Sequence, residues 1–202
     1  MDEVTQYLRN SDAVMEEIID TIQLPASDSS EDVFFDLVSC VLEQQIHYRA
    51  RGVYLKKFMV LTGDQLPTPA IIQSLDPHEF ALQKIAANKL KALQHLALYW
   101  ENHSLEAIDW QNCSNEEVIN HLEPIKGIGR WTIDMILLYT LGRPDIFSPS
   151  DFQLKKAMKT CYGLADDKNL MSEMTAIAER WKPYRSLATR YLLEWNKYLK
   201  KR

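Results

Sequence analysis

The sequence predicts an all-α protein, because apolar residues recur at helical spacing along almost the whole chain and alternating strand patterns of useful length are absent. Two apolar stripes carry this prediction. The first lies in the N-terminal third and comprises Phe34, Leu37, Val38 and Val41, with Gln45 at its polar end. The second lies near the C-terminus and comprises Ala188, Tyr191, Leu192, Trp195, Tyr198 and Leu199.

Further helices are predicted between the two stripes. They lie near residues 52–62, 78–84, 88–101, 115–122, 130–141, 151–161 and 168–181. Turn signals separate them at residues 24–32, 61–69, 126–129, 142–145 and 182–185. Acidic residues within 28–32 favour a helix N-terminus there, and Pro69, Pro77 and Pro183 each suit the first turn of a helix.

Length and composition are those of a soluble folded protein: 202 residues, 46% hydrophobic and 25% charged. No apolar run approaches the roughly 18 residues of a membrane-spanning helix, and the acidic N-terminus lacks the apolar segment of a secretory signal. The three cysteines are far apart and form neither a metal-ligand pair nor a disulfide framework. A reduced, cytoplasmic setting is the expectation.

The net charge of −5 argues against a broad basic surface for nucleic acid. Any phosphate contact has to come from local clusters of lysine and arginine, from helix N-termini or from backbone amides.

Residues 122–133 form the most informative stretch of the chain. A helix ends, Gly127 and Gly129 allow a tight turn, and a new helix begins at once. Such a turn points unpaired N–H groups outward, and a phosphate is their natural ligand. An isolated Gly-x-Gly also joins helices without binding anything, so that interpretation stays open. About twenty residues later the chain reads Ser-Pro-Ser-Asp, ending at Asp151.

Hairpin and aspartate together resemble the helix-hairpin-helix (HhH-GPD) DNA glycosylase superfamily. Residues 42–46 resemble its Gln-Gln block, which lies against the DNA minor groove, and residues 85–92 resemble one of its helix starts. Residues 181–188 are similar to the Trp-x-Pro-(Trp/Tyr)-Arg-Ser-x-Ala signature of the AlkA-type DNA-3-methyladenine glycosylase branch.

The resemblance implies that residues 1–202 form a single two-lobed helical unit with the active-site cleft between the lobes. The helix-hairpin-helix spans about 115–141, and the extra N-terminal lobe of some AlkA-type members is absent. The implied function is that of a monofunctional glycosylase, a monomer that removes alkylated purines such as 3-methyladenine from double-stranded DNA in base excision repair. A non-catalytic DNA-binding or damage-sensing protein with the same hairpin is the alternative.

Asp151 is the catalytic residue that the resemblance implies. An ionised carboxylate stabilises the oxocarbenium-like sugar that forms as the base leaves, and it can orient the attacking water. An alkylated purine is already cationic, so one carboxylate suffices. The alternative is that Asp151 only caps a helix. Asp134 and Asp145 are lesser candidates, and turn chemistry accounts for Asp145.

The predicted base pocket contains Trp131, Met135 and Leu193. Trp131 stands where bifunctional relatives carry the lysine that forms a Schiff base, so strand cleavage is not expected. The lack of a four-cysteine iron–sulfur pattern also disfavours a bifunctional enzyme. Trp131 is a candidate wall for a flipped base, or else an ordinary buried aromatic residue. Met135 and Leu193 replace residues that are often aromatic, which predicts a narrow substrate range.

The predicted DNA contacts are Gln44, Gln45, Gly127, Gly129, Arg130 and Thr132. The two glutamines either fill the gap left by the extruded nucleotide or form a polar helix end. Glu43 replaces the usual glycine and adds negative charge to this region. Lysines that follow Asp151 and lysines of the C-terminal tail are a solvated face by default, and one or two of them are possible phosphate contacts.

The resemblance also implies a structural Na⁺ or K⁺ ion at the hairpin, held by the backbone carbonyls of Glu123, Ile125 and Ile128. Backbone ligands leave no signature in side chains, so this expectation rests on the resemblance alone. No other cofactor is expected.

Overall fold

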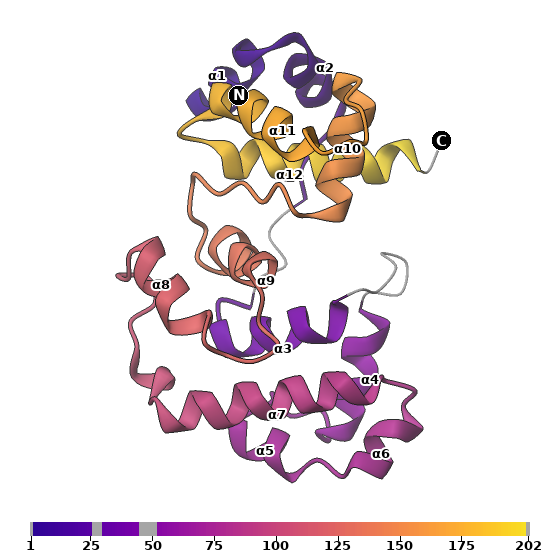
Figure 1. Ribbon diagram of the computed structural model, residues 1–202, viewed down its shortest axis with the longest axis vertical. Helices are drawn as coiled ribbons and strands as arrows, with labels where there is room; N and C mark the ends of the chain where they lie inside the picture. The colour runs from indigo at the N-terminus through magenta and orange to yellow at the C-terminus, as the bar shows by residue number, and fades with distance from the viewer. Residues whose placement is uncertain (1, 26–29, 45–51, 201–202) are drawn as a thin grey trace. The chain divides into compact units, whose positions relative to one another are not determined.

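A computed structural model describes residues 2–25, 30–44 and 52–200, which form helices joined by turns and loops (Figure 1). These residues contain no β-strand, so the predicted all-α class is confirmed. None of the helices in these ranges is both long and apolar enough to cross a membrane.

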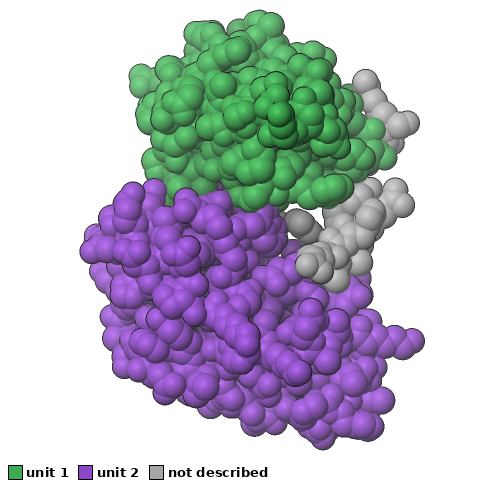
Figure 2. All heavy atoms as spheres, viewed as in Figure 1, with its two compact units in different colours: residues 1–28, 142–202 green, residues 29–141 purple. Residues whose placement is uncertain are grey.

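The chain divides into two compact units, as predicted for a two-lobed protein (Figure 2). Unit 1 contains both ends of the chain, residues 1–28 and 142–202, and unit 2 contains residues 29–141. The predicted cleft between the lobes, and the assignment of residues 1–202 to a single functional unit, stay predictions.

Unit 1 is a bundle with its own hydrophobic core. Its helices are α1 (Glu3–Ser11), α2 (Ala13–Thr21), α10 (Phe152–Tyr162), α11 (Leu170–Ala178) and α12 (Arg185–Leu199), with a 3₁₀ turn, η4, at Glu179–Trp181. Helix α12 packs against α10 and α2. The core includes Leu8, Met15, Ile18, Leu154, Met158, Met174, Trp181 and Leu192.

A partly buried polar contact joins the first two helices of unit 1 to the rest of the unit. The Tyr162 hydroxyl and the Trp181 indole N–H both donate to the carboxylate of Asp12, at 3.2 and 3.3 Å. Burial raises the pKa of Tyr162, so its phenol stays protonated and remains a donor.

Unit 2 is organised around one long helix, α7 (Ala87–Asn102), which packs against α3, α5 and α6. The other helices are α3 (Val33–Glu43), α4 (Val53–Leu61), α5 (Pro69–Ser74), α6 (Pro77–Leu82), α8 (Asn115–Leu122) and α9 (Arg130–Met135). A 3₁₀ turn, η2, spans Leu105–Ala107, and a π-helical turn, η3, continues α9 over Ile136–Thr140. Fully buried side chains include Leu37, Phe58, Leu93, Leu96 and Ile133.

The helix starts agree with two of the three proline predictions. Pro69 and Pro77 occupy the first turns of α5 and α6, after the capping residues Thr68 and Asp76. Pro183 was assigned wrongly, because α12 begins at Arg185. Lys182, which precedes this proline, has an extended backbone, the conformation that proline favours in its predecessor.

Candidate active site and DNA-binding hairpin

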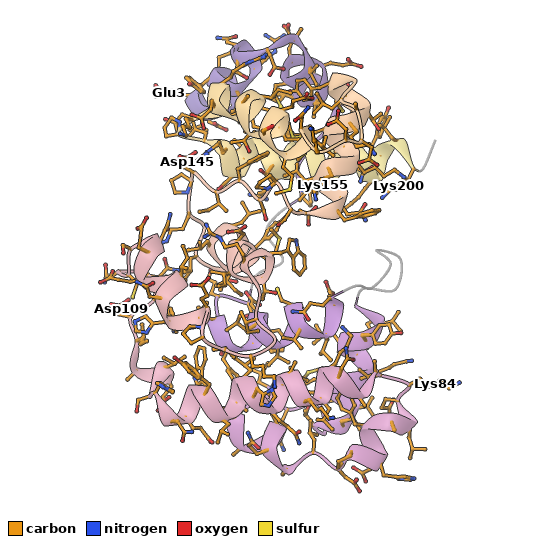
Figure 3. The ribbon with its side chains drawn as sticks, in the orientation of Figure 1. Glu3, Lys84, Asp109, Asp145, Lys155 and Lys200 are labelled. Carbon is orange, nitrogen blue, oxygen red and sulfur yellow. The ribbon has the colours of Figure 1, made fainter. Side chains whose placement is uncertain are left out.

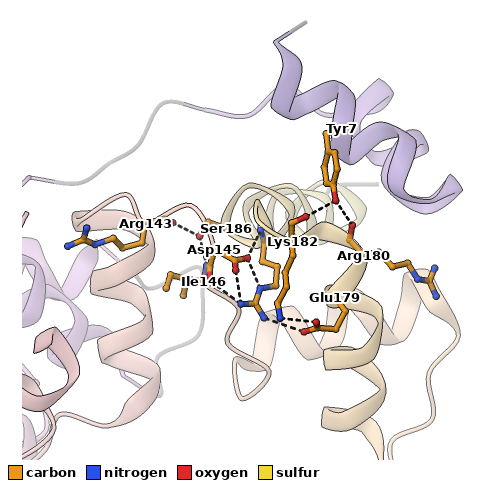
Figure 4. Close-up of polar contacts among 9 residues, drawn as sticks. Tyr7, Arg143, Asp145, Ile146, Glu179, Arg180, Lys182 and Ser186 are labelled. Atoms are coloured by element: carbon orange, nitrogen blue, oxygen red, sulfur yellow. Dashed lines mark hydrogen bonds and ion pairs between the residues drawn. The ribbon is translucent and has the colours of Figure 1, made fainter. Parts of the chain in front are cut away.

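Residues 143–146, in the segment that leads to Asp151, are held against the start of α12 by hydrogen bonds (Figure 4). The Arg185 guanidinium donates to both carboxylate oxygens of Asp145, at 2.7 and 2.9 Å. The Ser186 hydroxyl donates to the carbonyl of Arg143 and accepts from the backbone N–H of Ile146 at 2.8 Å. The Arg-Ser pair of the signature at residues 181–188 therefore holds residues 143–146 in place.

The two lesser catalytic candidates are both members of ion pairs. Burial raises the pKa of Asp145, but the hydrogen bonds and the charge of Arg185 lower it by more, so the net pKa lies below its usual value. Asp134 is 4% exposed and accepts from the Arg130 guanidinium at 2.8 Å. These contacts give both carboxylates a structural role.

Asp151 lies at the end of the clamped segment and is 6% exposed. Just before it, the Phe147 ring packs edge-on against Trp181 at 6.0 Å, and Ser148 is buried. Asp151 is the N-cap of α10, and its Oδ1 accepts from the backbone N–H of Leu154 at 2.7 Å. The capping role considered from the sequence is therefore confirmed.

Capping does not exclude catalysis at Asp151. A carboxylate has two oxygens and about four acceptor positions. The bond from Leu154 uses one of them. The N-terminus of a helix also favours a negative charge, which is the form that stabilises an oxocarbenium ion.

The first turn of α10 is tied to α12 by a small polar network. Asn196, which is 4% exposed, donates to Gln153 Oε1 at 2.9 Å. Lys200 donates to the same oxygen at 2.7 Å. Figure 3 shows Lys155 on α10 and Lys200 at the end of α12. Of the lysines that follow Asp151, Lys159 pairs with the carboxylate of Asp166 at 2.7 Å.

Phe152 is a candidate that the sequence reasoning missed. Phe152 directly follows Asp151 in the sequence and is 73% exposed. The buried face of α10 is formed by Leu154, Ala157 and Met158, a stripe that does not include Phe152. An aromatic residue outside the apolar stripe, next to the predicted catalytic carboxylate, was the signal in the sequence.

The two glycines of the hairpin serve different purposes. Gly127 has φ +98°, and a Cβ there would lie 2.9 Å from the Cβ of Ala92, so the fold itself requires glycine. Gly129 has φ −98°, and a Cβ there would meet nothing within 4 Å. The tight-turn explanation is therefore wrong for Gly129, which is the N-cap of α9 and provides no side-chain cap.

Gln44 lies against the hairpin. Its side-chain amide donates to the carbonyl of Gly127 at 3.1 Å and to the hydroxyl of Thr132 at 3.2 Å. Thr132 is 1% exposed, so its hydroxyl serves this internal contact. The DNA contacts predicted for Gln44, Thr132 and Arg130 stay predictions, and Gln45 lies outside the described residues.

The predicted pocket residues come from both units. Trp131 is half-buried and Met135 is 8% exposed, and their spacing of four residues places them on the same face of α9. Leu193 is in α12 of unit 1, partly buried against the core of that unit. Its place in the pocket stays a prediction.

The predicted cation ligands, Glu123, Ile125 and Ile128, lie between α8 and α9. The Ile128 N–H donates to the Ile125 carbonyl at 3.0 Å, and a carbonyl oxygen with a second lone pair can still contact a cation. Backbone carbonyls after a helix C-terminus are suitable ligands for a monovalent cation. In the ranges that the structure describes, no cluster of His, Cys, Asp or Glu could hold a metal.

An all-α fold that combines this hairpin with a buried aspartate at the next helix start is the arrangement expected of a helix-hairpin-helix protein. The model of the HhH-GPD superfamily of base excision DNA repair proteins matches residues 38–183. The chain belongs to this superfamily.

Curated relatives agree with this assignment, and a solved structure shares the fold. The chain is 31% identical to the alkylbase DNA glycosidase-like protein mag2 of Schizosaccharomyces pombe, over 77% of this chain and 74% of that protein. It is 27% identical to DNA-3-methyladenine glycosylase 2 of Escherichia coli, over 78% of this chain but 55% of that protein. The fold matches that of S. pombe 3-methyladenine DNA glycosylase Mag1 in complex with abasic DNA, with a TM-score of 0.84, 24% identity and 97% coverage of both chains.

Proposed function

We propose that this protein is a monofunctional DNA glycosylase that hydrolyses the N-glycosidic bond of alkylated purines in duplex DNA, as a step of base excision repair. The observation that carries the proposal is the buried carboxylate of Asp151 at the N-terminus of α10. Relatives from S. pombe and E. coli that are named DNA-3-methyladenine glycosylases support the choice of substrate class.

The chemistry follows from the charge of the reacting groups. As the bond from the sugar to the base breaks, positive charge develops on the sugar, and the Asp151 carboxylate stabilises it. An alkylated purine carries a positive charge before the reaction and departs as a neutral base, so it needs no strong general acid. The backbone N–H groups that follow Gly129 bind a DNA phosphate and fix the register of the protein on the duplex.

The position of Trp131 determines how the reaction ends. An indole has no amine that could attack the sugar, so no Schiff base forms and water is the nucleophile. The product is an abasic site in an intact strand.

An assay on an end-labelled duplex that carries N-methylated purines tests this function. We expect strand breaks only after treatment with alkali, which cleaves at abasic sites. Breaks without alkali would indicate a lyase activity. Absence of breaks in both samples, with retained DNA binding, would indicate the non-catalytic alternative. Duplex without methylation is the control.

The base range is expected to be narrow. A single aromatic ring contributes roughly 1–3 kcal/mol of stacking per base. The resemblance places Met135 and Leu193 at positions that are often aromatic. We therefore expect fast single-turnover excision of N3-methyladenine and slow excision of hypoxanthine, a neutral base whose departure needs more help. Comparable rates on the two bases would contradict this expectation.

We propose that the exposed ring of Phe152 supplies part of the missing stacking. Replacement of Phe152 by alanine should reduce excision of N3-methyladenine about tenfold, the effect of losing one stacking contact. Met171 in α11 is also an exposed apolar residue of unit 1, at 44%, and Met171→Ala is the matched control. An unchanged excision rate in a folded Phe152→Ala variant would show that Phe152 does not stack on the base.

We further propose that the carbonyls of Glu123, Ile125 and Ile128 hold Na⁺ or K⁺, which would stiffen the hairpin where it meets a phosphate. No organic cofactor is needed for the hydrolysis described above.

We propose that the protein acts as a monomer on double-stranded DNA with damaged bases, in the reducing cytoplasmic setting that the spacing of its cysteines favours.

A further inference from the structure

Lys89 is a lysine buried in the interior of unit 2, 8% exposed. Its ammonium group donates to the backbone carbonyls of Val41 and Gln44, both at 2.8 Å. These carbonyls belong to the C-terminal end of α3, where the helix dipole favours a positive charge. Burial lowers the pKa of Lys89, and the nearby charge of Glu43 offsets part of that shift.

The carbonyl of Gln44 connects Lys89 to the hairpin. While the Gln44 backbone accepts from Lys89, the Gln44 side chain donates to Gly127 and Thr132. The hairpin also rests directly on α7, because Gly127 approaches Ala92, one turn of that helix beyond Lys89. The buried ammonium group therefore joins the end of α3 to the start of α7, and the hairpin contacts both of these elements.

Lys89 and Glu43 also contact the two described residues that flank residues 45–51. Lys89 donates to the carbonyl of Gln44, the last described residue before them. The Glu43 carboxylate accepts from the backbone N–H of Gly52, the first described residue after them, at 3.2 Å. This contact explains why a carboxylate can stand where a glycine is usual in the Gln-Gln block.

We propose that Lys89 is a positioning residue for DNA binding, which acts through Gln44 to hold the α3 terminus and the hairpin in one fixed arrangement. The inference rests on the proposed function, since it assumes that these two elements contact DNA. Lys89 itself, buried beneath them, does not touch the substrate. A lysine whose only task was to fill the core would leave DNA affinity unchanged in the folded protein.

The test compares Lys89→Met with Gln44→Met and with the double variant. Methionine is as long as glutamine and one atom shorter than lysine, and it removes the hydrogen bonds of both side chains. We expect each single variant to bind undamaged duplex about tenfold more weakly in fluorescence anisotropy, and the double variant to bind no more weakly than Lys89→Met, because the two residues act as one unit. Lys168→Met removes the same charge from an exposed site in unit 1 and is the matched control.

The proposal also predicts which kinetic constant changes. In single-turnover excision, the enzyme concentration for half-maximal rate should rise about tenfold, while the rate at saturating enzyme changes less than twofold, because Asp151 is untouched. A fall in the saturating rate without weaker binding would overturn the proposal. So would additive losses in the double variant, or normal DNA affinity of folded Lys89→Met.

Two controls keep these outcomes separate from other failures. If the wild-type protein binds duplex DNA but excises nothing, the proposed function fails. The anisotropy measurements of DNA binding then still test the role of Lys89. If Lys89→Met does not fold, Gln44→Met can still overturn the proposal. Normal DNA affinity of that variant would show that Gln44 transmits nothing to the hairpin, and would overturn the proposal.

Discussion

The Asp151→Asn variant should lose about a hundredfold or more of the single-turnover excision rate while its melting temperature stays nearly unchanged. Asparagine is as good an N-cap as aspartate, so its side-chain oxygen can still accept from the N–H of Leu154. A neutral amide cannot stabilise the positive charge that develops on the sugar. Duplex binding should persist, because Asp151 acts on the transition state.

Two companion variants separate capping from catalysis. Asp151→Ala removes the cap as well as the charge and should lose about 1 kcal/mol of stability in addition to the rate. Asp32, the N-cap of α3, accepts from the N–H of Phe35 at 2.9 Å, so Asp32→Asn makes the same chemical change at another cap. It should leave the rate intact. If Asp151→Asn kept most of its rate, Asp151 would be a cap only.

The sequence predicted the long helices because each has an apolar stripe of several turns. The predicted helices near 88–101 and 115–122 correspond to α7 and α8 within one residue at each end. No helical range was predicted for α5, although Pro69 was expected in the first turn of a helix, since its six residues bury only Ile72 and show no periodic stripe. The π-helical turn at residues 136–140 was not predicted either, because its run Ile-Leu-Leu-Tyr-Thr is apolar almost throughout and contains no period.

The sequence singled out the residues of the candidate site better than it predicted their contacts. Asp151 and the hairpin were singled out because they resemble the motifs of the HhH-GPD superfamily. The roles of Arg185 and Ser186 were not, because their partners lie about 40 residues away in sequence. Lys89 was also missed as a site residue, since its acceptors in α3 are 48 and 45 residues distant and are backbone atoms. Contacts of that kind are set by packing, which local patterns do not contain.

The Gly129→Asp variant should fold at least as well as the wild type and yet lose about a hundredfold in affinity for any duplex. The structure has room for the new side chain, because a Cβ at Gly129 meets nothing and φ is −98°. Aspartate would cap α9, which lacks a side-chain cap, and so add a few tenths of a kcal/mol to stability. The same carboxylate would repel a phosphate and occupy its amide donors, whose hydrogen bonds to a charged group contribute about 1.5–3 kcal/mol each.

Gly127 gives the opposite expectation, because a substitution there should lower stability. The comparison of Gly127 with Gly129 therefore separates a role in folding from a role in DNA binding. Gly127→Ala should destabilise unit 2 by roughly 1–3 kcal/mol, because an alanine at φ +98° is strained and its Cβ would meet Ala92 at 2.9 Å. Asn169→Asp adds one negative charge at the exposed N-cap of α11 and should change neither stability nor binding by much. Melting curves and anisotropy titrations on damaged and undamaged duplex check all three variants. Unchanged affinity of a folded Gly129→Asp protein would mean that the start of α9 does not bind phosphate, and that DNA is held elsewhere.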